Sequence, residues 1–453
     1  MPEHVKNPAI SYTRLLDACL DMKKRDEVPG LAVGIWAAGK SYVLYDGVTN
    51  VDNPLTVNED TLFQIGSITK TFTGLAIMIL VSRGLVDLDT PICHVLTDFK
   101  MTDGQVTREA TIRHLLIHTG GWQGNSFEYP DLGEESLLAF VKIIGRLPQI
   151  SPLGKIWAYN STGFCIAGRI IEVLTGRPYE QAIAEMILRP LEMGNSVFTA
   201  GEAIVRRFAV GHERTRTGSI VPTAPWEIPR ALNPSGGLAC SLNNVMKYAR
   251  FMMEPGRPGC PACRPELMQG MFARQFDASG KADAAGLSWM LRYAGDVCIV
   301  RHGGATLGQF AELLMIPAQK FALAILTNGS NGENLIRDIT DRCLKECFSI
   351  SPKTYAAIAI DESSLSAFAG LYVGFANDIE ISHEKGMLMV QYHFKPVMKN
   401  QTVVPEPPPP MRAYFYAENR AITEQNGVLC DFFRDEQGVL RFLRHGNEVH
   451  VKR

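Results

Sequence analysis

The sequence lacks an excess of charge of either sign. Its 453 residues contain 45 Lys and Arg against 47 Asp and Glu, which gives a formal net charge of −2. A protein that mainly binds nucleic acid needs a basic surface to neutralise phosphates, so we expect no nucleic-acid partner. The composition, 46% hydrophobic and 20% charged, is typical of a folded chain and excludes a mainly disordered protein.

Long apolar runs are also missing. The longest strongly apolar segment, residues 71–82, is too short to span a bilayer, so we expect no membrane association. The first 25 residues lack a continuous apolar stretch and a small-residue cleavage site, and they are typical of an amphipathic helix. The ten cysteines require no disulfide framework in a chain of this length, so we expect a cytoplasmic protein.

Patterns that bind metals are scarce. Cys260 and Cys263 have C-x-x-C spacing, but a structural zinc site usually needs a second cysteine pair or nearby histidines, and neither follows. We expect a surface loop at this pair, with a metal or redox role as the minor alternative. The sequence predicts neither a metal nor a cofactor.

Strand patterns lie at both ends of the first 350 residues, with helical patterns between them. Residues 31–47 predict two strands joined by a tight turn, and residues 286–327 predict several more. Helical patterns cover residues 8–25, 67–84, 111–117, 136–146, 161–175, 179–188, 242–254 and 332–347. The sequence therefore predicts an α+β domain over residues 1–350, with one antiparallel sheet flanked by helices.

The sequence pattern differs after residue 350. Residues 351–363 resemble a linker, and residues 364–453 contain short alternating stretches separated by turn signals. Such spacing is typical of a small all-β barrel or sandwich. We predict a separate small domain there.

Ser67 and Lys70 form an S-x-x-K pattern at the start of the apolar helix. Residues three apart share a helix face, and a helix N-terminus offers free N–H groups to a developing anion. Burial lowers the pKa of a lysine and favours a neutral amine that can accept the serine proton. A lysine that reaches water from the helix end is the alternative. Ser382 and Lys385 repeat the pattern in a charged stretch, where we expect no chemistry.

Two further segments carry polar groups suited to a cleft. Residues 159–161, Tyr-Asn-Ser, precede an amphipathic helix, so Tyr159 can relay a proton or pack in the core. Residues 301–305 end a predicted strand with two glycines, which allow a substrate to approach the backbone. His302 can titrate near neutral pH there, or it can be an exposed residue of a tight turn.

The order of these patterns, Ser67-x-x-Lys70, Tyr159-x-x and His302-x-Gly304, resembles that of the penicillin-recognising serine hydrolases. This group includes class C β-lactamases, family VIII carboxylesterases, D-aminopeptidases and low-molecular-weight penicillin-binding proteins. Connecting segments such as TLFQIGSITKTFTG, TIRHLLIHTGGW, PSGGLACS and HGGATLGQF match as well. The resemblance covers residues 8–348 and implies a β-lactamase/transpeptidase-like fold. The C-terminal domain resembles the lipocalin-like barrels appended to some peptidase-like members.

The resemblance implies a role for each residue of these motifs. Ser67 would be the acylated nucleophile, Lys70 its proton acceptor, and Tyr159 the group that passes the proton to the leaving group. The backbone N–H groups of Ser67 and Ala305 would form the oxyanion hole. The implied substrate-binding residues are His302, Gly303, Gly304, Ser161, Asn160 and Trp122, with His118 as a further residue of the cleft or of a structural corner.

Two departures from the family pattern bear on the substrate. The second motif is usually Tyr-x-Asn, but here Ser161 holds the third position and Asn160 comes one residue early. His302 replaces the lysine that binds the antibiotic carboxylate in β-lactamases, and strand alternation points the adjacent Arg301 to the opposite face. Efficient β-lactam hydrolysis is therefore not expected, and histidine in this motif resembles D-aminopeptidases and some esterases.

The sequence thus predicts a serine hydrolase that forms an acyl-enzyme and cleaves an amide bond of a small peptide. A carboxylesterase with the same machinery is the first alternative. A catalytically silent relative that serves as a binding or scaffold protein is the second. The predicted partner is a small molecule or short peptide, and the oligomeric state stays open.

Overall fold

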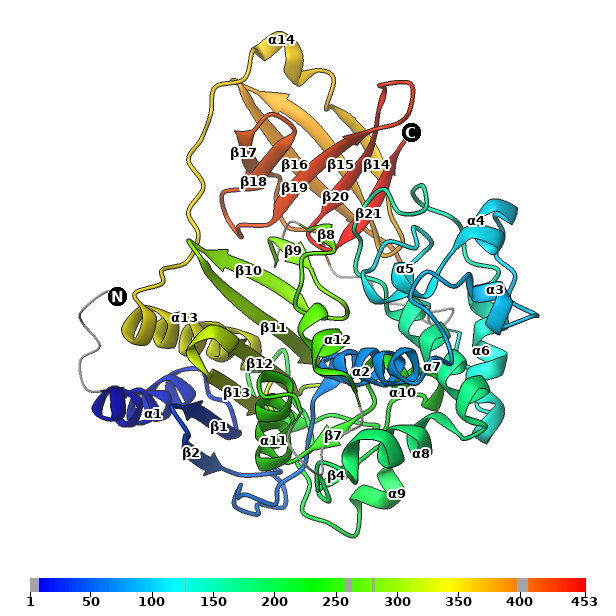
Figure 1. Ribbon diagram of the computed structural model, residues 1–453. Coiled ribbons are helices and arrows are strands. Elements are labelled where there is room, and N and C mark those ends of the chain that lie inside the picture. Colours follow the sequence, from blue (N-terminus) through cyan, green and yellow to red (C-terminus); the bar gives the residue numbers. More distant parts are fainter. Residues whose placement is uncertain (1–7, 127, 257–262, 279–281, 397–405) are drawn as a thin grey trace.

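A computed structural model describes residues 8–126, 128–256, 263–278, 282–396 and 406–453 of the chain. It contains a large part, made of helices around one large sheet with two small sheets beside it, and a β-barrel that lies above it (Figure 1). The predicted α+β fold with a C-terminal all-β barrel is confirmed. Of the cysteine pair, Cys260 lies outside the described residues, and Cys263 packs in the core, which corrects the expectation of a surface position.

The large part is built on an eight-stranded antiparallel sheet with the order β2-β1-β13-β12-β11-β10-β9-β8. The N-terminal hairpin therefore pairs with a strand from the end of the domain, as the sequence predicts. The strands are β1 (Gly30–Ala37), β2 (Lys40–Gly47), β8 (Phe276–Asp277), β9 (Ala284–Ala285), β10 (Met290–Ala294), β11 (Val297–Ala305), β12 (Phe310–Ile316) and β13 (Phe321–Thr327).

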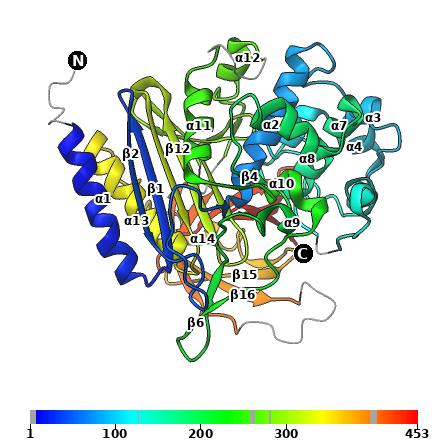
Figure 2. The ribbon, with the colours of Figure 1, turned by 90° about the horizontal axis from the view of Figure 1, so that it is seen from below.

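Both faces of this sheet are covered, which explains why every residue of β13 is buried. Side chains alternate between the two faces of a strand. Phe321, Leu323 and Ile325 pack in one core with α1 (Pro8–Arg25) and α13 (Gly332–Phe348), while the residues between them join the larger core on the other face. Figure 2 shows α1 and α13 on one side of the sheet and the other helices opposite.

Helix α2 (Thr69–Ser82) runs through the middle of the larger core, preceded by the short 3-10 helix η1 (Gly66–Ile68). Every residue from Thr69 to Leu80 is buried. The other helices of this part are α3 (Ile92–Val95), α4 (Gly104–Glu109), α5 (Ile112–Leu116), η2 (Gly133–Glu135), α6 (Ser136–Ile144), α7 (Ser161–Thr175), α8 (Tyr179–Ile183) with its π-helical continuation η3 (Ala184–Leu188), α9 (Ala200–Ala203), η4 (Arg230–Leu232), α10 (Asn233–Gly236), α11 (Leu242–Met253), α12 (Pro265–Gly270) and η5 (Pro317–Gln319). Short strands pair as β3 (Phe63–Gln64), β7 (Ala239–Cys240) and β4 (Ser196–Val197), and as β5 (His212–Arg214) with β6 (Ile220–Pro222).

An irregular connection over residues 349–361 and the short helix α14 (Glu362–Leu365) lead into the closed barrel. Its interior is filled by apolar side chains, with Phe368 packed between Phe415 and Phe432. The barrel strands are β14 (Gly370–Val373), β15 (Asn377–Glu384), β16 (Met387–Phe394), β17 (Met411–Ala417), β18 (Arg420–Thr423), β19 (Leu429–Arg434), β20 (Leu440–His445) and β21 (Glu448–Lys452).

The turn between β20 and β21 touches the large part just before α7. The backbone N–H of Tyr159 donates to the carbonyl of Asn447 at 3.0 Å. The Arg444 guanidinium donates to the carbonyl of Trp157 at 3.0 Å and pairs with the buried carboxylate of Asp431. These contacts fix the barrel turn against the segment that carries the predicted catalytic tyrosine.

None of the helices in the described residues combines the length and apolar character needed to cross a bilayer. The same residues hold no group of three or more His, Cys, Asp or Glu side chains placed to bind a metal ion.

Candidate active site

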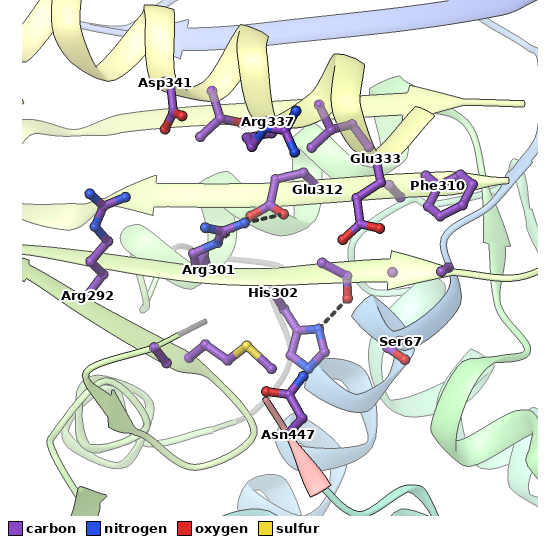
Figure 3. Close-up of a pocket in the computed structure, with 18 of the residues that line it drawn as sticks. Ser67, Arg292, Arg301, His302, Phe310, Glu312, Glu333, Arg337, Asp341 and Asn447 are labelled. Atoms are coloured by element: carbon purple, nitrogen blue, oxygen red, sulfur yellow. Dashed lines mark hydrogen bonds and ion pairs between the residues drawn. The ribbon is translucent and has the colours of Figure 1, made fainter. Parts of the chain in front are cut away.

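A cavity of about 530 Å³ brings the three sequence motifs together (Figure 3). Near Ser67 its walls come from η1, from the loop before α7, from the end of β11 and from the barrel turn. The cavity extends from there along β10 and β12 to α13 and residues 352–355. In the described part of the chain, β10 pairs with β11 only as far as Arg301, so the rest of β11 presents an edge to the cavity. Around Ser67 the lining residues include Tyr159, His302, Gly303, Gly304, Ala305 and Asn447.

Ser67 and Lys70 form the base of the site. The Lys70 Nζ atom lies 3.2 Å from Ser67 Oγ and donates to the carbonyl of Ser235 at 2.7 Å. Only 1% of Lys70 is exposed, and this burial lowers its pKa to about 7. Near neutral pH a large share of the lysine is therefore a neutral amine that can accept the serine proton.

A backbone carbonyl of helix α10 holds the Lys70 amine in place. The Thr73 hydroxyl donates to the carbonyl of Pro234 at 2.7 Å and lies 2.7 Å from the Tyr179 hydroxyl, so α2 and α10 are tied together. This places the next carbonyl, that of Ser235, over the Lys70 amine. The interpretation of the sequence gave Ser235 no role, although it lies in the PSGG segment that matches the family.

Tyr159 lies over Ser67 and Lys70. Its hydroxyl is hydrogen-bonded to Ser67, and its ring stacks on the His118 imidazole with ring centroids 4.6 Å apart and an interplanar angle of 28°. Lys70 Nζ lies 4.8 Å from the centre of the tyrosine ring. Burial raises the pKa of Tyr159 well above its ordinary value, so the hydroxyl keeps its proton at neutral pH.

Two glycines allow η1 and the end of β11 to touch backbone to backbone. Gly66 has φ +50°, and a Cβ atom there would lie 2.5 Å from the Ala305 nitrogen. A Cβ atom on Gly304 would lie 1.8 Å from the Ile65 carbonyl oxygen and 3.0 Å from the Ser67 nitrogen. Side chains at either position would push the two segments apart. The glycines therefore bring the backbone N–H groups of Ser67 and Ala305 close together beside the nucleophile.

His302 does not behave as the sequence predicts. Only 1% of it is exposed, and burial together with nearby Lys70 lowers its pKa to about 3. Its Nδ1 lies 2.7 Å from the carbonyl oxygen of Gly303, which can only accept, so Nδ1 carries the ring proton and Nε2 is an acceptor. Neither sequence-based expectation for His302 holds: it lies within β11, which continues to Ala305, so it is not in an exposed turn, and its burial lowers its pKa away from neutral pH.

Arg301 points away from His302, as strand alternation predicts. Its guanidinium makes two hydrogen bonds of 2.8 Å to the Glu312 carboxylate on the neighbouring strand β12. Figure 3 shows the pair on the opposite side of β11 from the imidazole. The arginine charge is therefore paired with a buried carboxylate rather than presented beside His302.

Asn160 holds the start of α7. Its Oδ1 accepts hydrogen bonds from the Gly163 N–H at 2.7 Å and from the Thr162 hydroxyl at 2.8 Å, while its Nδ2 donates to the Trp122 carbonyl at 3.0 Å. The described residues that line the cavity around Ser67 do not include Asn160, Ser161 or Trp122. The structure thus places these three expected substrate-binding residues beside the cavity wall, where they support the loop of Tyr159.

His118 also lies behind the wall. It is buried, it stacks on Tyr159, and its Nδ1 accepts a hydrogen bond from the Asn160 backbone at 2.9 Å. Sequence reasoning named this histidine but missed Asn447, which comes from a barrel turn far along the chain. No local pattern marks that asparagine, because only the packing of the two domains brings it to the cavity.

Comparison with known proteins agrees with this geometry. The sequence profile of the beta-lactamase family matches residues 16–342. The chain is 31% identical over 343 residues to Penicillin-binding protein 4 of Amycolatopsis lactamdurans, covering 74% of this chain and 90% of that protein. It is 31% identical over 239 residues to Esterase EstB of Burkholderia gladioli, covering 47% of this chain and 60% of that protein. The crystal structure of SurE, which has also been solved with D-Leu, superposes with a TM-score of 0.79 at 21% identity and covers 98% of this chain and 100% of SurE.

Proposed function

The chain belongs to the beta-lactamase family of serine hydrolases, and from this premise we propose that it cleaves an amide bond of a small peptide through an acyl-enzyme on Ser67. The observation that supports this most directly is the buried Lys70 amine 3.2 Å from the Ser67 hydroxyl. We assign the chemistry to residues 1–350 and treat residues 364–453 as a separate domain joined by the linker 351–363.

In the first step Lys70 acts as the base. The Ser235 carbonyl accepts one amine hydrogen, and the lone pair of the neutral amine is free to take the Ser67 proton. The serine oxygen then bonds to the substrate carbonyl carbon, and the carbonyl oxygen becomes negative. The backbone N–H groups of Ser67 and Ala305 stabilise that charge, and each such donor typically contributes about 10²–10³ in rate.

Tyr159 acts as the acid in the second step. Because its pKa is raised, it holds a proton that can pass to the leaving nitrogen as the carbon–nitrogen bond breaks, and Lys70 returns a proton to the phenol. Hydrolysis of the acyl-enzyme runs the same relay in reverse: the Tyr159 and Lys70 pair takes a proton from water, the hydroxide attacks, and Ser67 recovers its proton.

A carboxylesterase is the second candidate, and it is favoured by the 31% identity to Esterase EstB. The amide assignment rests on the protonated phenol, because an amine leaves only after protonation, whereas an alcohol can leave with less help. A silent binding protein is disfavoured by the cost of burying an amine among apolar side chains when it has no task.

Hydrolysis assays with matched substrates test the proposal. Purified full-length protein is given p-nitrophenyl esters beside L- and D-aminoacyl p-nitroanilides, including D-leucyl p-nitroanilide because SurE has been solved with D-Leu. A fluorophosphonate probe and peptide mapping locate the reactive serine. Turnover of anilides with label on Ser67 is the expected result. Turnover of esters alone would make the protein an esterase, and an unlabelled Ser67 would overturn the hydrolase assignment.

A further inference from the structure

The carbonyl that bonds the Lys70 amine belongs to a very short helix. Helix α10 covers only Asn233–Gly236, and the last carbonyls of a helix have no donor inside it. The carbonyls of Pro234 and Ser235 instead accept hydrogen bonds from α2, from the Thr73 hydroxyl and the Lys70 amine, at 2.7 Å each. Because Lys70 and Thr73 lie three residues apart on one face of α2, the position of α10 decides how the Ser235 carbonyl meets the amine.

A buried tyrosine extends this contact to helix α8, which lies beside α2 and α10 (Figure 2). Tyr179 is the first residue of α8, and its hydroxyl lies 2.7 Å from the Thr73 hydroxyl. The Thr73 proton goes to the Pro234 carbonyl, which can only accept, so Tyr179 donates to Thr73. Burial raises the pKa of Tyr179 well above its ordinary value, so the phenol keeps this proton. A chain of hydrogen bonds therefore runs from α8 through α2 to α10.

The residue after Tyr179 holds the same short helix. The Glu180 carboxylate accepts a hydrogen bond from the Asn233 side-chain amide at 2.7 Å and pairs with the Arg230 guanidinium at 3.0 Å. Asn233 is the first residue of α10 and is buried. Two neighbouring residues of α8 thus act on two neighbouring residues of α10, and the next residue, Ser235, presents its carbonyl to the catalytic lysine.

The anchoring side chains lie outside the reaction itself. Thr73 is 0% exposed and Tyr179 is 1% exposed, and the described residues that line the cavity around Ser67 include neither of them. Burial of a hydroxyl costs free energy, and an apolar pair of the same shape would fill the same space. What the two hydroxyls add is direction, because a hydrogen bond holds the Pro234 carbonyl at a defined angle.

We propose that Tyr179, acting through Thr73, is a positioning residue for Lys70: it fixes α10 so that the Ser235 carbonyl holds the amine beside Ser67. The inference rests on the proposed function, since it takes Lys70 as the base of that same site. It predicts that loss of either hydroxyl slows the acylation of Ser67 although both side chains lie outside the cavity.

The pH dependence of acylation reports on this arrangement, because Lys70 titrates near neutral pH. The other titratable groups around the amine do not change charge there, since burial shifts the pKa of each in favour of its neutral form: His118, His302, Tyr159 and Cys165. A carbonyl bonds an ammonium more strongly than an amine. Displacement of the Ser235 carbonyl should therefore lower the midpoint of the acid limb.

Labelling of Ser67 by a fluorophosphonate measures acylation directly. The rate constant is followed between about pH 5 and pH 9 in the full-length protein and its variants. Thr73→Val keeps the shape of the side chain and removes its hydroxyl, so we expect a plateau rate about tenfold lower and a midpoint lower by about half a pH unit. Thr73→Ser keeps the hydroxyl and should retain both values.

Tyr179→Phe tests the far end of the chain. We expect a plateau rate about threefold lower and a smaller shift of the midpoint in the same direction, because Thr73 can still donate to Pro234. The double variant with Thr73→Val should lose little more than Thr73→Val alone, since Tyr179 acts through Thr73.

Thr71→Val is the matched control. Thr71 lies on the same helix and is also 0% exposed, but its hydroxyl donates to the Ile68 carbonyl at 2.8 Å and not to α10. This variant should lower the melting temperature as Thr73→Val does and leave the plateau rate and the midpoint unchanged.

The outcomes separate this inference from the proposed function. If Ser67 of the unmodified protein is not labelled, the proposed function itself fails. If it is labelled, an unchanged or raised midpoint in Thr73→Val overturns the positioning role and leaves the hydrolase assignment standing, because a loosened core or entry of water then explains any loss of rate. Equal losses in Thr71→Val would overturn it as well. Should Thr73→Val not fold, the rate and midpoint of Tyr179→Phe decide the question.

Discussion

The pattern S-x-x-K occurs twice in this chain, in two different kinds of structure. Ser67 lies in η1 and Lys70 is in the first turn of α2, so the two side chains meet on one helix face at 3.2 Å. Ser382 lies in strand β15 of the barrel, and Lys385 follows in a turn with φ +52°. Ser382 and Lys385 do not share a helix face, and both are exposed, so the second pair lacks the geometry and the burial of the first.

The surroundings of the two lysines differ as much as their backbones. Lys70 is 1% exposed and its pKa is lowered to about 7 by burial. The Lys385 side chain is 83% exposed and lies 3.3 Å from the Glu384 carboxylate, a surface pair that contributes little to stability. The same four-residue pattern thus gives a buried amine beside a serine in one place and an exposed lysine in the other. What distinguishes them is the apolar helix that follows Lys70.

Removal of the two serine hydroxyls gives the largest expected contrast. Ser67→Ala should lower kcat/KM by about 10⁴-fold or more, because nucleophile and base act as one unit. Ser382→Ala, in an exposed strand position, should leave kcat/KM unchanged. Steady-state kinetics on the best anilide or ester measures both, with circular dichroism melting curves to show that each variant is folded. Near-native turnover by Ser67→Ala would remove Ser67 as the nucleophile.

Much of the large domain can be predicted because its signals are local. Helix α7 (Ser161–Thr175) begins after an asparagine N-cap and ends at Gly176 in the left-handed conformation. Both residue types are preferred at these helix ends, so both ends can be predicted from the sequence. Strand β13 is a continuous apolar run because helices cover both faces. Asparagine is a preferred N-cap residue, so helix capping explains the position of Asn160 before α7. The substrate-binding role expected for Asn160 is not needed to explain it.

The parts that could not be predicted depend on contacts between distant segments. A strand pattern that ends in His-Gly-Gly suggests an exposed turn, but β11 continues to Ala305 and His302 is buried within it. The Ser235 carbonyl reaches Lys70 because α10 is tied to α2 through Thr73. Neither feature leaves a periodic or spacing signal in the chain. The Ser67 and Lys70 pair could therefore be predicted from its spacing, while the contacts from distant segments that surround it could not.

Removal of the proton-relay residues Lys70 and Tyr159 gives a second contrast with Lys385. Lys70→Ala and Tyr159→Phe should each lower kcat by about 10²–10⁴-fold, because each removes a group that carries the same proton. The double variant should cost little more than the worse single change, since residues that act together are strongly non-additive. Lys385→Ala should have no effect on kcat. Losses in the double variant equal to the product of the single losses would contradict a shared relay and would require two independent proton paths.

The pH dependence gives the smallest effect and the finest test of the two lysines. Acylation needs neutral Lys70, and burial lowers the pKa of that lysine to about 7, so activity should be lost as pH falls through this value. For a substrate without a titrating group, kcat/KM should rise about tenfold per pH unit below pH 7 and level off above it. His302 should add no inflection near neutral pH, because its pKa is lowered to about 3 by burial. Profiles of the unmodified protein and of Lys385→Ala should superpose, since the exposed lysine takes no part. A rate that falls between pH 6 and pH 8 would mean that the active form carries the proton, and Lys70 would then be an acid or an electrostatic anchor rather than the base.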